Sequence, residues 1–267
     1  MNDLRIALVQ GATRWHDPEG NRDYYGALLA PLRQCHDLVL LPETFTSGFS
    51  NDAIDNAEGM DGPTVAWMRE HAEALDAALC GSVQLRVDDK VFNRLLFVTP
   101  DGRLTHYDKR HLFRFAGEHQ RYVPGHERVS VDWRGWRMCL QVCYDLRFPV
   151  FSRNRHDVER AQALDYDLLV NVANWPAARN HAWSTLLRAR AIENLCFVAG
   201  LNRVGQDGNG LEYDGASAII DPLGMPLAEN RGEETVLEAV LSAQQLAEHR
   251  ERFPAMLDAD RFQLQGM

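Results

Sequence analysis

The chain has 267 residues, of which 45% are hydrophobic and 25% are charged, and its formal net charge is −10. This composition is typical of a globular chain that buries one large core or two modest ones. The negative charge argues against a nucleic-acid partner, because binding to phosphates needs a basic face.

No apolar run approaches the roughly 20 residues of a membrane span. The first ten residues, MNDLRIALVQ, also lack the basic segment and the apolar core of a secretory signal. We therefore expect a cytoplasmic protein that has no membrane partner and binds a small molecule. The five cysteines are odd in number, irregularly spaced and free of CxxC motifs, so the sequence predicts reduced thiols, no disulfide framework and no metal site.

The first part of the chain reads as a β-α-β unit followed by a second helix. Apolar runs predict strands at 4–10 and 38–41, and the segment 21–35 between them is long enough for a helix, with Pro31 as a point of distortion. Pro63 suits the first turn of a further helix, whose apolar residues recur at helical spacing through Cys80.

The middle of the chain predicts antiparallel strands. The apolar-rich runs 80–87 and 91–99 are joined by three polar residues, Asp-Asp-Lys. A Pro-Asp-Gly turn then leads into a third piece at 103–108. We expect these three segments to be neighbours in one sheet.

The last third of the chain continues the alternation of strands and helices. Residues 166–173 are almost wholly apolar, as in a strand that is buried on both faces. A turn is predicted at 221–224. The remaining predicted elements are a helix at 180–194, strands at 196–202 and 216–220, and a final helix at 244–253.

Strands and helices alternate from end to end, and no linker rich in Pro, Gly or Ser divides the chain. One α/β domain over residues 1–267, built on a mixed sheet, explains this pattern best. Two packed halves are the alternative, because strand-helix units occur both before residue 80 and after residue 166.

Cys143 stands at the carboxyl end of a short alternating run, where a strand stops. In an open α/β sheet this end borders the crevice in which ligands bind, so the position suits a nucleophile. Position alone is weak support, since most free cysteines act as small buried hydrophobes. One face of the run carries Trp136, Met138, Leu140 and Val142, and the other carries Arg137, Cys139, Gln141 and Cys143.

Two further polar residues follow predicted strands. Glu43 comes after a buried apolar run, where desolvation would raise its pKa and make it a useful base, although a capping or loop acid is the alternative. Lys109 ends another strand-like piece, and the alternative to a functional role is an ordinary surface lysine. If it lay near Cys143, its charge would favour the thiolate and stabilise an oxyanion. Sequence spacing does not show that the three residues converge.

Three segments resemble the signature blocks of the nitrilase, or carbon-nitrogen hydrolase, superfamily. They are Leu41-Pro42-Glu43-Thr44-Phe45, Tyr107-Asp108-Lys109-Arg110-His111-Leu112-Phe113 and Cys143-Tyr144-Asp145-Leu146-Arg147-Phe148-Pro149. The blocks occur in the family's order, and the resemblance covers a core of about residues 4–240, followed by a C-terminal helix and tail at 243–267.

The resemblance implies a role for each motif residue. Glu43 becomes the general base, Lys109 binds the tetrahedral intermediate, and Cys143 forms the covalent acyl-enzyme. Glu118 resembles the second glutamate that many members place beside the lysine. The backbone N–H of Tyr144, directly after the nucleophile, becomes an oxyanion donor.

The resemblance also implies a fold and an assembly. The family's fold is an α-β-β-α sandwich, which needs no metal and no organic cofactor. Members commonly form homodimers or higher homo-oligomers through helices.

The stretch 109–119 most resembles the bacterial ω-amidases, which hydrolyse the terminal amide of 2-oxoglutaramate or 2-oxosuccinamate. Such a substrate carries a carboxylate remote from the amide, so the pocket should offer an arginine or a cluster of donors. Arg147 has an alternative role, because it belongs to a signature block and could fix the turn by pairing with an acid. The candidates for substrate binding are Phe113, Arg114, Arg147, Arg179 and Trp175, the last of which could wall the pocket or serve only in packing.

Three other interpretations compete with this one. A papain-type thiol hydrolase would pair Cys143 with a histidine such as His111, His119 or His126. A catalytically inactive scaffold or binding protein could use the same fold. Within the enzyme class, a carbamoylase, a general aliphatic amidase or a nitrilase is the alternative to an ω-amidase.

Overall fold

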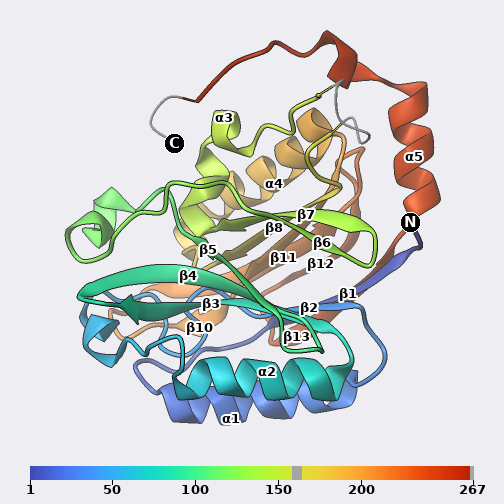
Figure 1. The fold of residues 1–267 in the computed structure, drawn as a ribbon. Coiled ribbons are helices and arrows are strands. Elements are labelled where there is room, and N and C mark those ends of the chain that lie inside the picture. Colours follow the sequence, from blue (N-terminus) through green and yellow to red (C-terminus); the bar gives the residue numbers. More distant parts are fainter. Residues whose placement is uncertain (158–163, 265–267) are drawn as a thin grey trace.

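Two β-sheets lie face to face between two layers of helices, which is the arrangement that the family resemblance implies (Figure 1). The computed structural model describes residues 1–157 and 164–264. Within these ranges, no helix combines the length and the apolar character that crossing a membrane requires.

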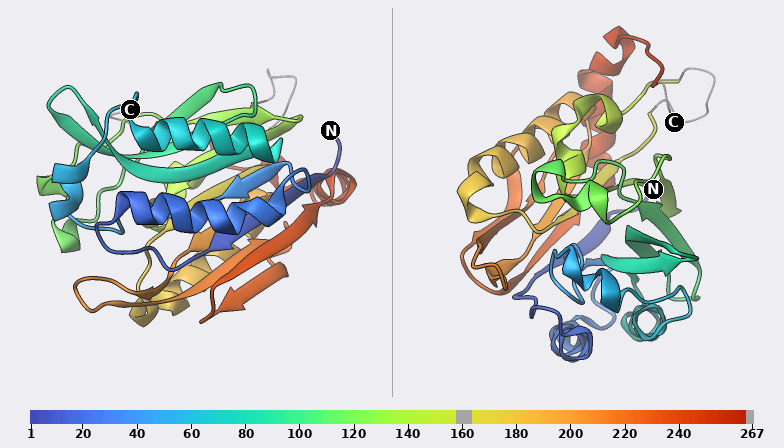
Figure 2. Two further views of the ribbon diagram at one scale, coloured as in Figure 1. Left: turned by 90° about the horizontal axis from the view of Figure 1, so that it is seen from below. Right: turned by 90° about the vertical axis from the view of Figure 1, so that its left-hand side faces the viewer.

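The first sheet is mixed and has six strands in the order β13-β1-β2-β3-β4-β5. Its central strands β1, β2 and β3 are parallel, and the others add antiparallel pairs. Helices α1 (Pro18–Leu29) and α2 (Pro63–Leu75) lie side by side over its outer face (Figure 2). The strands are β1 (Leu4–Gln10), β2 (Leu38–Leu40), β3 (Ala78–Val87), β4 (Lys90–Val98), β5 (Leu104–Asp108) and β13 (Thr235–Leu241).

The second sheet is also mixed, with the order β10-β11-β9-β8-β7-β6 and with β12 paired to β11. Its central strands β7, β8 and β9 are parallel. Helix α4 (Asn180–Asn194) covers its outer face, and the short α3 (Pro149–Ser152) and the late α5 (Ala243–Arg252) flank it (Figure 1). The strands are β6 (Ser130–Trp133), β7 (Trp136–Val142), β8 (Leu168–Ala173), β9 (Phe197–Asn202), β10 (Val204–Gln206), β11 (Glu212–Ile220) and β12 (Pro226–Arg231).

Apolar side chains fill all three interfaces between the layers. The cluster between the two sheets takes up Trp136, Met138, Leu140 and Val142, while Cys139 faces the α4 layer, as the predicted strand alternation requires. Separate clusters lie under α1 and α2 and under α4. The central strands are therefore buried on both faces, which explains their almost continuous apolar sequences.

Helix α1 begins earlier and ends earlier than the predicted segment 21–35. Asp17 caps its first turn by accepting a hydrogen bond from the N–H of Gly20 at 2.9 Å, and Pro18 occupies the first helical position. The helix ends at Leu29, and Pro31 lies in the 3₁₀ turn Ala30–Leu32 that follows. Proline therefore ends this helix instead of distorting its middle, because it removes a backbone donor.

The prediction that the second helix continues to Cys80 is wrong. Helix α2 ends at Leu75, because Asp76 adopts the left-handed conformation (φ 52°) and its N–H bonds to the carbonyls of Ala72 and Glu73. Cys80 instead pairs with Leu40 of β2. The apolar spacing between residues 75 and 79 fits a helix and a buried strand equally well, so pairing with β2 decided the outcome.

The other predicted elements are confirmed, with boundaries that shift by one or two residues, except that β11 extends back to Glu212. Strands β6, β10, β12 and β13 have no counterpart among the predicted elements. Strand β12 is largely exposed and polar, so it gives no apolar signal. Strand β13 pairs with β1 along its whole length, which places residues 235–241 beside the first strand of the chain.

Asp167, just before β8, joins the second sheet to the C-terminal helix. Its buried carboxylate accepts hydrogen bonds from the guanidinium groups of Arg137 on β7, at 2.8 and 3.0 Å, and Arg250 on α5, at 2.6 Å. Burial by itself would raise the pKa of Asp167, but the two arginines hold that pKa below its usual value.

Replacement of this carboxylate should weaken the fold. A carboxyl with a lowered folded pKa contributes stability that is complete above its unfolded pKa, about 3.9, and is lost as the pH falls through the folded pKa. We expect Asp167→Asn to lower the free energy of unfolding at pH 7 by about 3 kcal/mol. It should also flatten the loss of stability below pH 4, as measured by urea unfolding. Asp89→Asn, at an exposed position in the turn between β3 and β4, is the control and should change little.

Candidate active site

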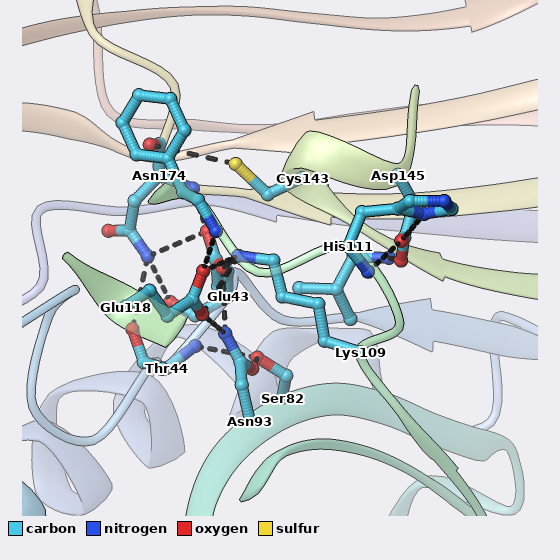
Figure 3. A network of polar contacts seen from close by, with 12 residues as sticks. Glu43, Thr44, Ser82, Asn93, Lys109, His111, Glu118, Cys143, Asp145 and Asn174 are labelled. Carbon is cyan, nitrogen blue, oxygen red and sulfur yellow. Dashed lines mark hydrogen bonds and ion pairs between the residues drawn. The ribbon is translucent and has the colours of Figure 1, made fainter. Parts of the chain in front are cut away.

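Four polar residues that follow strands of both sheets line one cavity of about 240 Å³. Glu43 comes three residues after β2, Lys109 directly after β5, Cys143 directly after β7 and Asn174 directly after β8. Figure 3 shows the four side chains turned toward one another. Glu43, Lys109 and Cys143, which the sequence left as separate candidates, therefore share one site.

Cys143 occupies a sharp turn at the end of β7. It has a positive φ of 48° and begins the 3₁₀ helix Cys143–Arg147, so the thiol leaves the strand direction and enters the cavity. A positive φ is uncommon for a residue with a side chain and requires support from its surroundings. Asp145 gives that support, because its Oδ2 accepts the N–H of Val142 at 3.0 Å and closes the turn.

Asp145 also joins two of the sequence blocks. Its Oδ2 accepts the hydroxyl of Tyr107 at 2.7 Å, and its Oδ1 contacts the backbone N–H of His111 at 3.0 Å and the Nδ1 of the same residue at 2.7 Å. The imidazole of His111 stacks on Phe148, with ring centroids 3.7 Å apart. The block that holds Lys109 and the turn that holds Cys143 are thus fixed to each other by one buried carboxylate (Figure 3).

Glu43 is fully buried, and both of its carboxylate oxygens are hydrogen bonded. Oε1 accepts from Lys109 Nζ at 2.9 Å and from Asn93 Nδ2 at 2.8 Å, and Oε2 accepts from the backbone N–H of Asn174 at 2.7 Å. The following residue, Thr44, has a φ of 42°, so the chain turns sharply after the carboxylate. These donors come from β4 and from the residues that directly follow β5 and β8, and they hold Glu43 in one orientation.

Lys109 lies between two carboxylates. Its ammonium contacts Glu43 Oε1 at 2.9 Å and both oxygens of Glu118, at 3.0 and 2.9 Å, and it lies 5.2 Å from the ring centre of Phe49. Burial alone would lower the pKa of this ammonium, but Glu118 and Glu43 together hold it well above its usual value. Lys109 therefore carries a permanent positive charge in the cavity.

Glu118 is the second carboxylate of this group. Besides Lys109, its Oε2 accepts the N–H of Phe113 at 2.5 Å, and its Oε1 lies 3.3 Å from Asn93 Nδ2. Burial raises the pKa of Glu118, and the charge of Glu43 adds to this effect while Lys109 opposes it. The side chain connects the lysine to the 3₁₀ turn Arg114–Ala116 at the cavity wall.

The Cys143 thiol is held in its protonated form. Burial raises its pKa well above the usual value, and the nearby carboxylate of Glu43 raises it further. Lys109 acts in the opposite direction, as the sequence predicted, but its effect is smaller than that of burial and Glu43. Nucleophilic attack at neutral pH therefore requires a proton acceptor. Glu43 is adjacent to the thiol and can accept a proton.

The predicted substrate-binding residues divide into two groups. Phe113, Arg147, Trp175 and Arg179 all line the cavity, and so does Tyr144, whose backbone N–H lies in the first turn of the 3₁₀ helix, where it has no intrahelical acceptor. Arg114 is exposed and does not line the cavity, so the structure does not bring it to the site.

Arg147 and Arg179, the two arginines of the cavity, stack over aromatic rings and do not pair with carboxylates of the described residues. The guanidinium of Arg147 lies 4.8 Å from the ring centre of Trp175, and that of Arg179 lies 5.6 and 5.1 Å from the rings of Phe113 and Phe115. Within residues 1–157 and 164–264, neither arginine forms an ion pair. Arg147 therefore does not fix the turn through an acid, as the alternative interpretation required.

No histidine of the described ranges lines the cavity. His111 is engaged by Asp145, as noted above, and neither His119 nor His126 reaches the cavity. The papain-type arrangement of a thiol beside an imidazole is therefore not present. Among the described residues, no group of three or more His, Cys, Asp or Glu side chains is arranged to hold a metal ion.

Sequence reasoning missed several residues of the site. Asn93, a buried amide in the largely apolar strand β4, could have been found because an amide at such a position needs partners. Asn174, directly after the apolar run 166–173, had the same kind of signal. The hairpin between β10 and β11 gave none, because its cavity position depends on the packing of distant segments. It contributes Asp207, Asn209, Leu211 and Tyr213.

Comparison with known proteins finds relatives over the whole chain. The sequence model of the carbon-nitrogen hydrolase family matches residues 5–251. The ω-amidase YafV of Yersinia enterocolitica is 48% identical over 99% of this chain and 100% of that protein. The 2-oxoglutaramate amidase of Bacillus subtilis is 35% identical over 83% of this chain and 84% of that protein.

A solved structure agrees with the fold described above. A CN-hydrolase superfamily protein of Xanthomonas campestris, whose crystal structure has an arsenic adduct in the active site, is 68% identical. It superposes with a TM-score of 0.97 over 99% of this chain and 100% of that chain.

The electrostatics of the cavity predict how the thiol responds to the loss of its neighbouring charge. Because the carboxylate of Glu43 contributes to the raised pKa of Cys143, Glu43→Gln should lower that pKa. We expect the rate of alkylation by iodoacetamide to rise at lower pH in this variant than in the wild type. Glu58→Gln, a change outside the cavity, is the control. An unchanged or upward-shifted profile in Glu43→Gln would contradict the described contact between the two groups.

Proposed function

This chain belongs to the carbon-nitrogen hydrolase family and is an amide-hydrolysing enzyme, and we propose that it cleaves a small linear ω-amide of the 2-oxoglutaramate or 2-oxosuccinamate type. The products are the carboxylate and ammonia. The observation that carries the proposal is the meeting of Glu43, Lys109 and Cys143 in one cavity. The ω-amidase and 2-oxoglutaramate amidase relatives support the substrate class.

In the first half of the proposed reaction, Cys143 Sγ attacks the amide carbon while its proton passes to Glu43. The tetrahedral intermediate then collapses: the C–N bond breaks, Glu43 returns the proton to the leaving nitrogen, and ammonia departs. A thioester remains on Cys143. The raised pKa of the thiol makes this transfer necessary, because the resting sulfur is not ionised at neutral pH.

In the second half, water hydrolyses the thioester. The water oxygen attacks the acyl carbon while Glu43 accepts a proton from the water, and the C–S bond then breaks. The departing thiolate takes the proton back from Glu43, and the carboxylic acid product loses its own proton to solvent. The enzyme returns to its starting protonation state, and no redox partner or cofactor is required.

The oxyanion of both tetrahedral intermediates needs donors that are already in place. The proposed donors are the ammonium of Lys109 and the backbone N–H of Tyr144. Lys109 keeps its charge at all working pH values, because two carboxylates surround it. Glu118 is proposed to hold Lys109 in position, through contacts with both of its carboxylate oxygens.

The remote end of the substrate is proposed to contact Arg147 and Arg179. Both guanidinium groups line the cavity, and within the described parts of the chain neither pairs with a carboxylate. A bound carboxylate would supply the missing partner, with bidentate geometry available. Phe113 and Trp175 hold the two guanidinium planes and wall the cavity.

The proposal includes a cytoplasmic location and assembly as a homodimer or higher homo-oligomer. A patch of exposed apolar side chains supports the assembly. Ile192 on α4, Leu223 and Met225 are 53%, 59% and 61% exposed, and the turn that carries the last two packs against Ile192 at Gly224.

A substrate panel tests the proposed specificity. Ammonia release should be faster with 2-oxoglutaramate or 2-oxosuccinamate than with glutamine, a carbamoyl amino acid or a nitrile at equal concentration. Glutamine has the same amide and carboxylate, but it carries an ammonium in place of the oxo group, and the guanidinium groups of Arg147 and Arg179 in the cavity would repel this positive charge. A preference for any of the last three would support a glutamine amidase, a carbamoylase or a nitrilase instead. Cys143→Ala should abolish turnover of every compound that the wild type hydrolyses.

Arginine substitutions test the proposed recognition of the carboxylate. We expect Arg179→Met and Arg147→Met each to raise KM for 2-oxoglutaramate about 10-fold or more, because a charge-assisted hydrogen bond contributes about 1.5–3 kcal/mol. For the uncharged amide butyramide, the same variants should change kcat/KM by less than about threefold. Arg114→Met is the matched control and should leave both substrates unaffected. Equal losses for charged and uncharged amides would contradict the assignment.

A further inference from the structure

A chain of hydrogen bonds between buried polar groups lies beside the carboxylates of Glu43 and Glu118 (Figure 3). It runs from the backbone N–H of Thr44 through Ser82 on β3 to Asn93 on β4. Ser82 is fully buried and Asn93 is 1% exposed, although both lie on strands that are otherwise largely apolar. Buried polar groups in such surroundings need partners, and here the partners lead to the catalytic group.

Asn93 bridges the same two oxygens that Lys109 bridges. Its Nδ2 lies 2.8 Å from Glu43 Oε1 and 3.3 Å from Glu118 Oε1. The ammonium of Lys109 lies 2.9 and 3.0 Å from these two atoms. One cationic donor and one neutral donor therefore hold the pair of carboxylates together, and they offset the repulsion between the like charges.

Ser82 determines which way the amide of Asn93 points. The hydroxyl of Ser82 accepts the N–H of Thr44 at 2.8 Å, and it donates its single hydrogen to Asn93 Oδ1 at 2.9 Å. With Oδ1 fixed as the acceptor, the NH₂ end of Asn93 must face Glu43 and Glu118. The opposite orientation would place an amide oxygen against two carboxylates.

The hydrogens of Lys109 show why this bridge matters. An ammonium has three N–H groups, and all three have carboxylate partners here, namely Glu43 Oε1, Glu118 Oε1 and Glu118 Oε2. Donation to a substrate oxyanion requires one of these hydrogens to leave its partner. While that hydrogen turns away, both oxygens of Glu118 keep a hydrogen bond. Oε1 of Glu118 accepts from Asn93, and Oε2 accepts from the N–H of Phe113.

We propose that Asn93 is a positioning residue that holds Glu43 and Glu118 in place while Lys109 turns one N–H toward the oxyanion, and that Ser82 sets its orientation. This inference rests on the proposed roles of Glu43 and Lys109. The interaction gains most of its value in the transition state, because in the resting site Lys109 also contacts both carboxylates, whereas donation to the oxyanion costs it one of these contacts. Its loss therefore lowers kcat and leaves KM almost unchanged.

Asn93→Leu tests the inference, because leucine has a similar size and no hydrogen-bonding group. With the best amide of the substrate panel, kcat should fall on the order of 10²-fold, while KM stays within about twofold. Asn154→Leu is the matched control. Asn154 is also a buried asparagine, with bonds to the carbonyls of Tyr166 and Asn194, but it lies outside the cavity. This control should lower Tm and leave kcat within about twofold.

Ser82→Ala provides a second test that removes only one oxygen atom. It should lower kcat without changing KM, and its effect should be smaller in the Asn93→Leu background than in the wild type, because Ser82 acts through Asn93. If Asn93→Leu does not fold, the kcat of Ser82→Ala decides by itself, and a value within twofold of wild type overturns the inference.

Other results would overturn the inference in recognisable ways. The inference fails if Asn93→Leu keeps a kcat within twofold of wild type, or if this variant changes only KM. It also fails if Asn154→Leu lowers kcat by as much as Asn93→Leu does. Cys143→Ala separates this failure from that of the proposed function. If Cys143→Ala retains activity, the proposed mechanism fails. If Cys143→Ala is inactive while Asn93→Leu retains full activity, only the role of Asn93 fails.

Discussion

One buried ammonium between two buried carboxylates constrains the rest of this structure. Lys109, Glu43 and Glu118 are each at most 1% exposed, and the group has one more negative charge than positive if both carboxylates are ionised. Charges that leave water lose several kcal/mol of solvation each, and mutual attraction offsets this loss only where further hydrogen bonds complete the geometry. Those further donors, Asn93 and Asn174, come from β4 and from the end of β8.

This requirement explains why the site lies where two sheets meet. In the first sheet, Asn93 lies in β4 and Lys109 directly follows β5, while in the second sheet Cys143 directly follows β7 and Asn174 directly follows β8. The apolar cluster between the sheets sets their separation, because its side chains interlock and resist compression. The core therefore acts as the rigid support that holds Asn93 and the ends of β5, β7 and β8 around one cavity.

The cavity separates two chemical tasks. At its inner end, burial and the charge of Glu43 raise the pKa of the Cys143 thiol well above its usual value. Further out, Arg147 and Arg179 lie on aromatic rings and have no acidic partner within the described residues. A substrate with an amide at one end and an anion at the other matches this division. The same division explains why removing a remote arginine should affect binding, whereas removing an inner donor should affect turnover.

The sequence by itself determined the strand alternation around Cys143, most of the helices and strands, and the three motif blocks, because these depend on local periodicity and on residue identity. It could not determine that α2 stops at Leu75, since the apolar spacing there fits both a helix and a strand and pairing with β2 decides between them. Nor could it reveal the partners of Asn93 or the absence of an acid beside Arg147. Only the tertiary structure decided that Glu43, Lys109 and Cys143 share a cavity, because hydrogen bonds between residues 66 or 131 positions apart depend on how the two sheets pack.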